Sequence, residues 1–270
     1  MNNKTIIKFW YNELNFPKKY DREFYSALEN SDIRGDISIE NYDLKETDGK
    51  KNLLYYLYFC EELKKRYESK GISKKILLDT LSDIVRWTNV WSELKGELYL
   101  GEISWLSDHM KMKLFRLGRL QYCFSRAKFD VLSRQIKKND NIIDVHIPAG
   151  KPLKREDCTA SFKKANVFFK KYFPEFGYNY YMTHSWLLDE NLKEILKPES
   201  NILNFQNMFE VVKRVRSDDV LRFVFKNNTT RENIAAAVCA SAFEEHIKKK
   251  AQSGGDFYAN YGVINKNDFN

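Results

Sequence analysis

The chain has 270 residues, of which 43% are hydrophobic and 30% are charged, and its formal net charge is +8 at pH 7. This composition is typical of a globular protein and excludes a disordered chain, and the length suffices for one large domain or two modest ones. No apolar run is long enough to predict a membrane span. The N-terminus, MNNKTIIKFWYNELNF, carries acidic and amide residues where a secretory signal would be apolar.

The cysteines and the basic residues further limit the classes of protein to which the chain can belong. Cys60, Cys123, Cys158 and Cys239 show no metal-binding spacing, so we expect reduced thiols, a cytoplasmic location and no metal. The positive charge is spread over short runs beside acids, as in EELKKRYESK, which is typical of solvated helix faces. No nucleic-acid-binding motif occurs, so we do not expect a nucleic acid as partner. The oligomeric state is not indicated.

Residues 1–104 are predicted to form a helical N-terminal domain. Apolar residues recur at helical spacing over 52–71 and 74–94, and shorter segments at 6–16 and 22–30 also fit helices. The polar, glycine-bearing segment 31–50 predicts a loop.

Residues 105–270 are predicted to form a second domain in which strands alternate with helices. We expect a short helix at 101–113, strands at 114–125 and 140–150, and an amphipathic helix at 158–173. A strand at 178–183, a short helix at 190–197 and strands at 200–209 and 220–226 follow, with 211–219 as a connection. A long helix is expected at 231–252, and the last twenty residues should be loosely ordered. The pattern predicts an α+β fold, a mixed β-sheet flanked by helices.

The most informative segment is YNYYMTHSWLLDENLKEILK, residues 178–197. Its alternating aromatic residues predict a strand that brings His184 and Ser185 to a strand-to-helix turn, where Asp189 can cap the following helix. Ligands of α/β domains often bind at such strand ends and helix N-termini.

Four segments resemble a known family: RLGRLQY (116–122), HIPAGKPL (146–153), SFKKANVFFKKYFPE (161–175) and HSWLLDENLKEILKPESNILNF (184–205). Together they are similar to the GNAT-like C-terminal domain of bacterial N-acyltransferases that carry a helical N-terminal domain. The resemblance implies transfer of an acyl group from acyl-CoA, or acetyl-CoA, to an amine on a small molecule or peptide.

The resemblance also implies a place for CoA. In such folds the pyrophosphate lies against the helix that follows a splayed strand, which correspond here to 156–172 and 141–147. Gly150 would allow close backbone approach, and Lys151, Lys154 and Arg155 would neutralise phosphates. The segment PAGKPLKRED holds one glycine and two prolines, so it departs from the usual glycine-rich pyrophosphate loop. A basic surface turn is the structural alternative.

Acyl transfer needs a base for the amine and an acid for the departing thiolate. The candidates are His184, His146 and either Tyr180 or Tyr181, with a histidine suited to the base role and a tyrosine to the acid. The alternative is that both histidines are structural residues at strand ends, where their rings only form hydrogen bonds with neighbouring groups.

Arg116, Arg119 and Gln121 form a further candidate site for an acidic substrate or for the cofactor phosphates. Ion pairing of these arginines with Asp130 or Asp144 is the structural alternative. The function that competes with acyl transfer is a catalytically inactive GNAT-like module that binds a ligand or protein.

Overall fold

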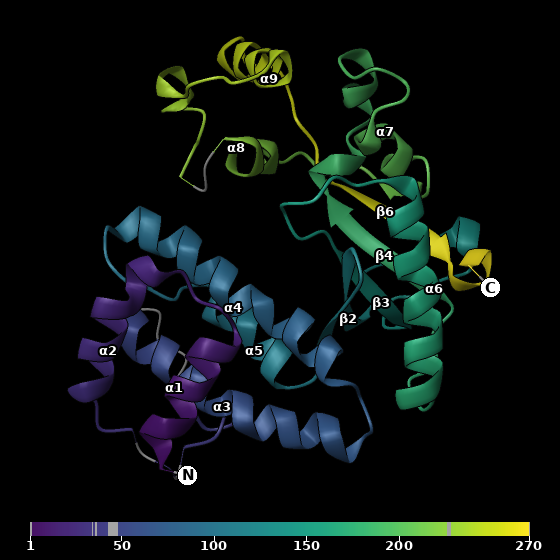
Figure 1. Ribbon diagram of the computed structural model, residues 1–270. Coiled ribbons are helices and arrows are strands. Elements are labelled where there is room, and N and C mark those ends of the chain that lie inside the picture. Colours follow the sequence, from purple (N-terminus) through teal and green to yellow (C-terminus); the bar gives the residue numbers. More distant parts are fainter. Residues whose placement is uncertain (1, 34, 36, 43–47, 226–227, 270) are drawn as a thin grey trace. The chain divides into compact units, whose positions relative to one another are not determined.

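The computed structural model describes residues 2–33, 35, 37–42, 48–225 and 228–269 and divides into two compact units, Met1–Leu117 and Gly118–Asn270 (Figure 1). Residues 34, 36 and 43–47 of the expected 31–50 loop lie outside the described residues, as does residue 226 of the expected 220–226 strand. None of the described helices is both long enough and apolar enough to cross a membrane.

Unit 1 is helical, as predicted. Its elements are α1 (Asn3–Glu13), η1 (Lys18–Tyr20), α2 (Asp21–Glu29), α3 (Gly49–Ser69), α4 (Lys74–Lys95), α5 (Ile103–Met110) and the terminal strand β1 (Leu114–Leu117). The side chain of Ser73 accepts a hydrogen bond from the Ile76 amide at the start of α4, and Gly96 ends this helix with a left-handed backbone. Local capping thus sets the bounds of the longest helix.

Unit 2 is built on a mixed β-sheet, which confirms the predicted fold class. Its strands are β2 (Leu120–Arg126), β3 (Asn141–His146), β4 (Tyr180–Ser185), β5 (Glu210–Lys213) and β6 (Asn260–Asn265). Within this unit they lie in the order β2-β3-β4-β6-β5, and β3 with β4 is the parallel pair. The helical elements are η2 (Leu132–Arg134), α6 (Arg155–Tyr172), η3 (Trp186–Leu188), η4 (Glu190–Glu194), α7 (Asn201–Gln206), α8 (Asp219–Val224), η5 (Ile234–Ala236), α9 (Ala242–Gln252) and η6 (Lys266–Phe269).

One face of this sheet is covered by α6 (Figure 1). Phe162 of α6 makes edge contacts with Tyr122 of β2 and Tyr181 of β4, with ring centroids 5.8 and 4.9 Å apart. Ile143 and Val145 of β3 are fully buried, whereas Asp144 and His146 between and after them are only partly buried. The period of two therefore directs the polar side chains of β3 to the opposite face.

The opposite face carries a smaller apolar cluster beneath the loop that joins β2 to β3. Its buried members are Ala127, Val131, Ile136, Ile142, Met182 and Val263. The loop is fastened by paired hydrogen bonds between Val131 and Ile136 and by a bond from Ser133 Oγ to the Glu210 carboxylate, 2.8 Å. The loop thereby forms a wall beside the ends of β3 and β4.

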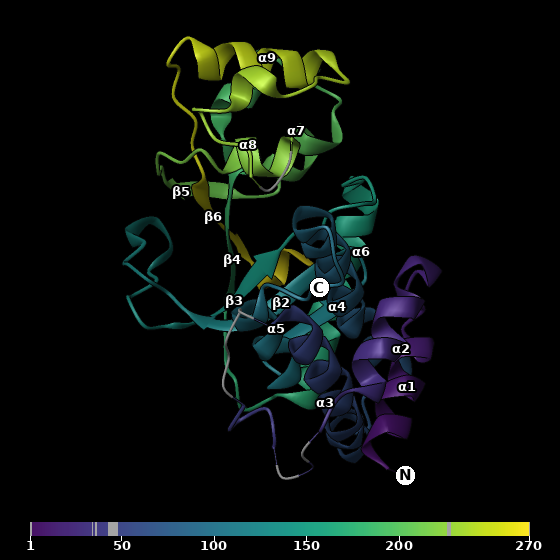
Figure 2. The same ribbon diagram turned by 90° about the vertical axis from the view of Figure 1, so that its left-hand side faces the viewer.

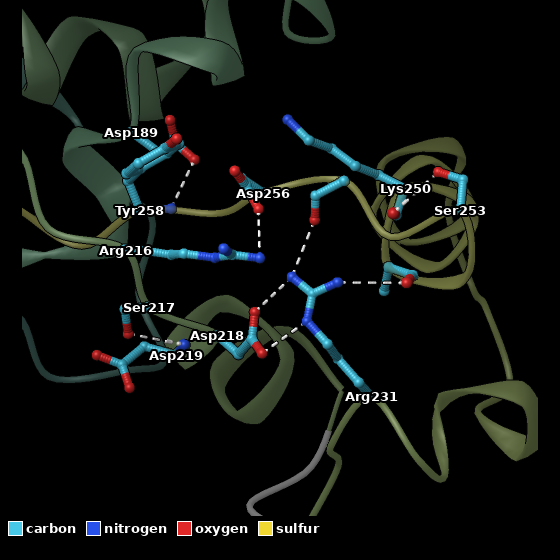
Figure 3. A network of polar contacts seen from close by, with 12 residues as sticks. Asp189, Arg216, Ser217, Asp218, Asp219, Arg231, Lys250, Ser253, Asp256 and Tyr258 are labelled. Atoms are coloured by element: carbon cyan, nitrogen blue, oxygen red, sulfur yellow. Dashed lines mark hydrogen bonds and ion pairs between the residues drawn. The ribbon is translucent and has the colours of Figure 1, made fainter.

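Apart from β5, residues 186–258 between β4 and β6 form a mainly helical insertion, and its helices lie beyond one end of the sheet (Figure 2). A separate apolar cluster that includes Leu221, Ile234, Ile247 and Phe257 holds it together. Arg231 crosses this insertion: its guanidinium donates two hydrogen bonds to Asp218, of 2.7 and 2.6 Å, and others to the carbonyls of Ala251 and Gly255 (Figure 3).

Several predicted elements of this half were wrong in type. The segment 200–209 contains helix α7 instead of a strand, and the Ser200 side chain caps this helix by accepting from the Leu203 amide. The described part of 220–226 contains α8 instead of a strand, since a short apolar run does not distinguish the two. The expected 190–197 helix is the shorter 3-10 helix η4, and the 211–219 connection begins with most of β5.

Three further predictions differ from the structure in extent. The expected strand at 114–125 is broken at Gly118, whose φ of 91° ends β1 before β2 begins. The expected helix at 231–252 is divided into η5 and α9, with Ser241 capping the second. The described part of the last twenty residues is ordered, since β6 pairs with both β4 and β5.

Candidate active site

The parallel strands β3 and β4 separate at their carboxyl ends. Ile143 pairs with Tyr181 and Asp144 with Met182, and at the next step the Thr183 hydroxyl donates to the Val145 carbonyl, 2.8 Å. A buried side chain therefore takes the place of a backbone donor where the strands part. This opening lies beside His146, the last residue of β3, and His184, the last but one of β4.

His184 is held in one orientation by its neighbours on β6. Its Nε2 lies 3.0 Å from the Ala259 carbonyl oxygen, which can only accept, so the hydrogen of the neutral ring resides on Nε2. The ring stacks on Tyr261 with centroids 4.2 Å apart. The lone pair is thus on Nδ1 of an exposed ring, which is the tautomer that a general base requires.

The β2–β3 loop supports this stack from the other side of Tyr261. Phe129 makes an edge contact with Tyr261 at 4.9 Å, and Lys213 Nζ lies 4.5 Å from the Phe129 centroid. Lys213, Phe129, Tyr261 and His184 therefore form a continuous row across the loop, β5, β6 and β4.

Asp144 lies on the same face of β3 as His146. Its Oδ2 is 3.6 Å from His146 Nε2, which is within ion-pair range but too long for a hydrogen bond. Burial raises the pKa of Asp144, and His146, Lys128 and His184 partly oppose this shift. Electrostatic coupling thus joins Asp144 to both candidate histidines.

Tyr181 does not lie with the histidines, because it faces α6 on the other side of the sheet. Its hydroxyl donates to Asn166 Oδ1, 2.7 Å, and is 2.9 Å from the Tyr178 hydroxyl. Burial raises the pKa of Tyr181 far above its ordinary value. Tyr180 is partly buried on the histidine side, against the cluster beneath the β2–β3 loop.

The expected CoA-binding residues lie on the loop between β3 and α6. Lys151, Lys154 and Arg155 are exposed, and Gly150 has a φ of 114° that favours glycine. Helix α6 begins at Arg155 without a side-chain cap, so its first amides point to the loop without a local acceptor. This arrangement suits an anion.

The guanidinium of Arg119 binds this loop and is therefore not available to an acidic substrate. It donates to the carbonyls of Pro148, Lys151 and Pro152 at 2.8, 2.6 and 3.1 Å. The side chain is buried, with 9% of the residue exposed. It thereby fixes the backbone that leads to the start of α6.

The other two members of the expected arginine site are placed differently. Arg116 belongs to unit 1, where its guanidinium donates to Ser82 Oγ, 3.1 Å, and its amide to Thr80 Oγ1, 3.0 Å. Gln121 is buried on β2 and is the register partner of His146. Asp130, the ion-pair alternative, accepts from the Lys138 amide.

Asp189 has the capping role that its position predicted. Its carboxylate accepts from the amide of Asn191, 3.1 Å, and from that of Tyr258, also 3.1 Å. Figure 3 shows the bond to Tyr258. Burial nevertheless raises the pKa of Asp189. The residue therefore joins the end of β4 to the start of β6.

Sequence reasoning missed three features of this site. Asp144 could have been found from the alternation in DVH, which puts it on one face with His146. Tyr261 and the Ala259 carbonyl gave no signal, because the C-terminal segment showed no clear strand pattern.

No group of three or more metal-binding side chains occurs in the part of the chain that the structure describes.

The mixed sheet with its splayed parallel pair and the helix α6 defines a GNAT-like domain. Residues 114–264 match the GNAT-like C-terminal domain, and residues 16–112 match the N-acyltransferase N-terminal domain. The first match alone covers more than half of the chain. This chain belongs to the family of N-acyltransferases that combine these two domains.

Solved structures support the fold. An acyltransferase in complex with decanoyl-CoA and teicoplanin has a TM-score of 0.70 and 21% identity, covering 80% of this chain and 66% of that one. An acyltransferase in complex with decanoyl-CoA has a TM-score of 0.69 and 26% identity, covering 79% and 65%. The chain therefore spans somewhat less than two thirds of the length of these structures. Comparison with curated proteins gives no match.

Proposed function

We propose that this protein transfers an acyl group from acyl-CoA to an amine. The observation that carries the proposal is the state of His184: its Nε2 hydrogen is directed to the Ala259 carbonyl, and its Nδ1 lone pair is exposed beside the opening between β3 and β4. Similarity to acyltransferases that bind decanoyl-CoA supports the same reaction.

In this proposal the CoA pyrophosphate binds at the uncapped N-terminus of α6, where Lys151, Lys154 and Arg155 add positive charge. The loop lacks the glycine-rich sequence of many GNAT-like domains. Arg119 compensates by holding the loop carbonyls inward, so that the loop keeps one conformation without several glycines. Arg119 is thus a positioning residue for the cofactor site.

The chemistry uses the histidine side of the sheet. The thioester carbonyl enters the opening between β3 and β4, and His184 Nδ1 takes a proton from the attacking amine. The carbon–nitrogen bond forms, the carbon–sulfur bond breaks, and the CoA thiolate leaves with one proton, so that the net reaction moves a single proton from the amine nitrogen to sulfur. His146, the last residue of β3, lies beside the opening and is placed to pass that proton.

Tyr181 takes no part in this route, since its hydroxyl is sealed between Asn166 and Tyr178 beneath α6. We include a small-molecule or peptide amine as the acceptor; one similar structure is an acyltransferase in complex with decanoyl-CoA and teicoplanin. A cytoplasmic location, expected from the scattered cysteines, remains part of the proposal.

Calorimetry with decanoyl-CoA and acetyl-CoA tests the proposal first, followed by an assay of free thiol release with amines. We expect binding of at least one acyl-CoA and amine-dependent release of CoA. Absence of binding up to millimolar concentration would contradict acyl transfer. Binding without turnover across a broad amine panel would favour the inactive GNAT-like module.

A further inference from the structure

The carboxylate of Asp144 is an unusual group on this face of the sheet. It lies on β3 opposite Cys123 of β2 and Met182 of β4, which are both buried. A carboxylate in such surroundings is unfavourable unless a cation or hydrogen-bond donors offset the loss of water.

The groups that face Asp144 use only part of the hydrogen-bond acceptor capacity of its carboxylate. A carboxylate offers about four acceptor positions. The Val145 amide supplies one donor, and His146 Nε2 remains 3.6 Å away. His184 on β4 and Lys128 on the β2–β3 loop act only through the electric field, and the Lys128 side chain is exposed to water.

Among the described residues no lysine or arginine forms an ion pair with Asp144, while the Asp144 side chain keeps 25% of its surface open. A cationic ligand of small size would fit this environment, because it would satisfy the carboxylate and bring a donor between the two histidines.

We propose that Asp144 binds the acceptor as an ammonium ion, which makes the acceptor class a protonated primary amine; this inference rests on the proposed acyl transfer. Asp144 holds the ammonium through a charge-assisted hydrogen bond, and His184 Nδ1 removes one proton to give the neutral nucleophile. After attack on the thioester, the second nitrogen proton goes to the thiolate. The products are the amide, CoA with a free thiol, and one proton on His184 that returns to water.

The test compares the wild type with Asp144→Asn, which keeps the shape of the side chain and removes its charge. Glu175→Gln is the matched control, since Glu175 is an exposed carboxylate in the loop after α6. Release of CoA from decanoyl-CoA is measured at pH 7 with n-hexylamine and D-glucosamine, which are cationic, and with hydroxylamine, which is uncharged. Decanoyl-CoA affinity and circular dichroism are recorded for each protein.

For Asp144→Asn we expect the KM of the cationic amine to rise about 10- to 100-fold, the range for loss of one charge-assisted hydrogen bond. The KM of hydroxylamine and the affinity for decanoyl-CoA should remain unchanged. Glu175→Gln should behave as the wild type.

Three results would overturn the assignment. An unchanged KM for cationic amines would remove the ammonium site. An equal fall in kcat for hydroxylamine and cationic amines, at constant KM, would make Asp144 a positioning residue for His146. Acylation of hydroxylamine without acylation of either cationic amine would exclude this acceptor class. Failure of the wild type to bind decanoyl-CoA would instead overturn the proposed function itself.

Discussion

At the scale of single residues, the state of a side chain depends on neighbours that are distant in the sequence. His184 is exposed and would rotate freely without the Ala259 carbonyl and the Tyr261 ring. Both partners belong to the C-terminal segment. Fixing the ring by a carbonyl and a stacked aromatic aligns the lone pair before substrate binds, which is a general requirement for proton transfer.

His184→Gln is therefore expected to lower kcat by roughly 100-fold or more, the usual loss for a general base. The glutamine amide nitrogen can take the place of Nε2 and donate to the Ala259 carbonyl, but glutamine has no basic nitrogen. Steady-state kinetics with decanoyl-CoA and an amine measures the effect, while calorimetry should show unchanged decanoyl-CoA affinity. His246→Gln is the control, because His246 is exposed on α9. Equal kcat in both variants would remove His184 from the mechanism.

Asp144 links the site to the pH dependence of stability. Burial raises the pKa of Asp144 in the folded state, with His146, Lys128 and His184 facing it. A group with a raised folded pKa stabilises the fold fully below its unfolded pKa, about 3.9, and this stabilisation is lost as pH rises through the folded pKa.

Asp144→Asn is accordingly expected to have a higher free energy of unfolding than the wild type at pH 8, with a smaller difference at pH 4. Urea denaturation at the two pH values measures it, with Glu175→Gln as the control. A variant that is less stable than the wild type at pH 8 would show that the ionised carboxylate stabilises the fold.

At the scale of elements, two arginines hold segments without regular secondary structure in place through hydrogen bonds to backbone carbonyls. Arg119 binds three carbonyls of the β3–α6 loop, and Arg231 binds Asp218 and two carbonyls of the insertion. The planar guanidinium suits this role because its donors are fixed relative to one another.

Arg119→Lys should loosen the β3–α6 loop, because an ammonium cannot reach three carbonyls in one plane. We expect a loss of roughly 2 kcal/mol in the free energy of unfolding. Hydrogen exchange should be faster over residues 147–158, and decanoyl-CoA should bind more weakly. Arg126→Lys is the control, since exposed Arg126 donates one bond to the Asn139 carbonyl, 3.0 Å. Unchanged exchange in the loop would contradict the clamp.

Arg231→Lys should destabilise the insertion by about 1–2 kcal/mol through loss of the bidentate contact with Asp218 (Figure 3). Arg216→Lys, at an ion pair whose arginine side chain is 68% exposed, should change stability by less than about 1 kcal/mol. The rate of limited proteolysis within 218–257 compares the two variants, and we expect faster cleavage in Arg231→Lys. Equal cleavage of the two variants would show that Arg231 does not secure this segment.

At the scale of the whole molecule, each unit has its own construction. Unit 1 consists mainly of helices, whose backbone hydrogen bonds and caps are local, so the helices were predictable from spacing. Unit 2 depends on a sheet whose neighbouring strands β4 and β6 are separated by the insertion of 186–258. Non-local pairing of this kind leaves little trace in a short window of sequence.

The sequence by itself determined the helical first part, the mixed sheet with α6 and the family, because these depend on apolar periodicity and on distinctive segments such as HSWLLDENLKEILK. It also indicated His146 and His184 as candidates. Only the tertiary structure decided that β6 completes the sheet beside β4, that Tyr181 lies beneath α6, and that Arg119 binds a loop. The physical reason is the same in each case: pairing, burial and hydrogen-bond partners come from residues far away in the chain, and no local pattern specifies them.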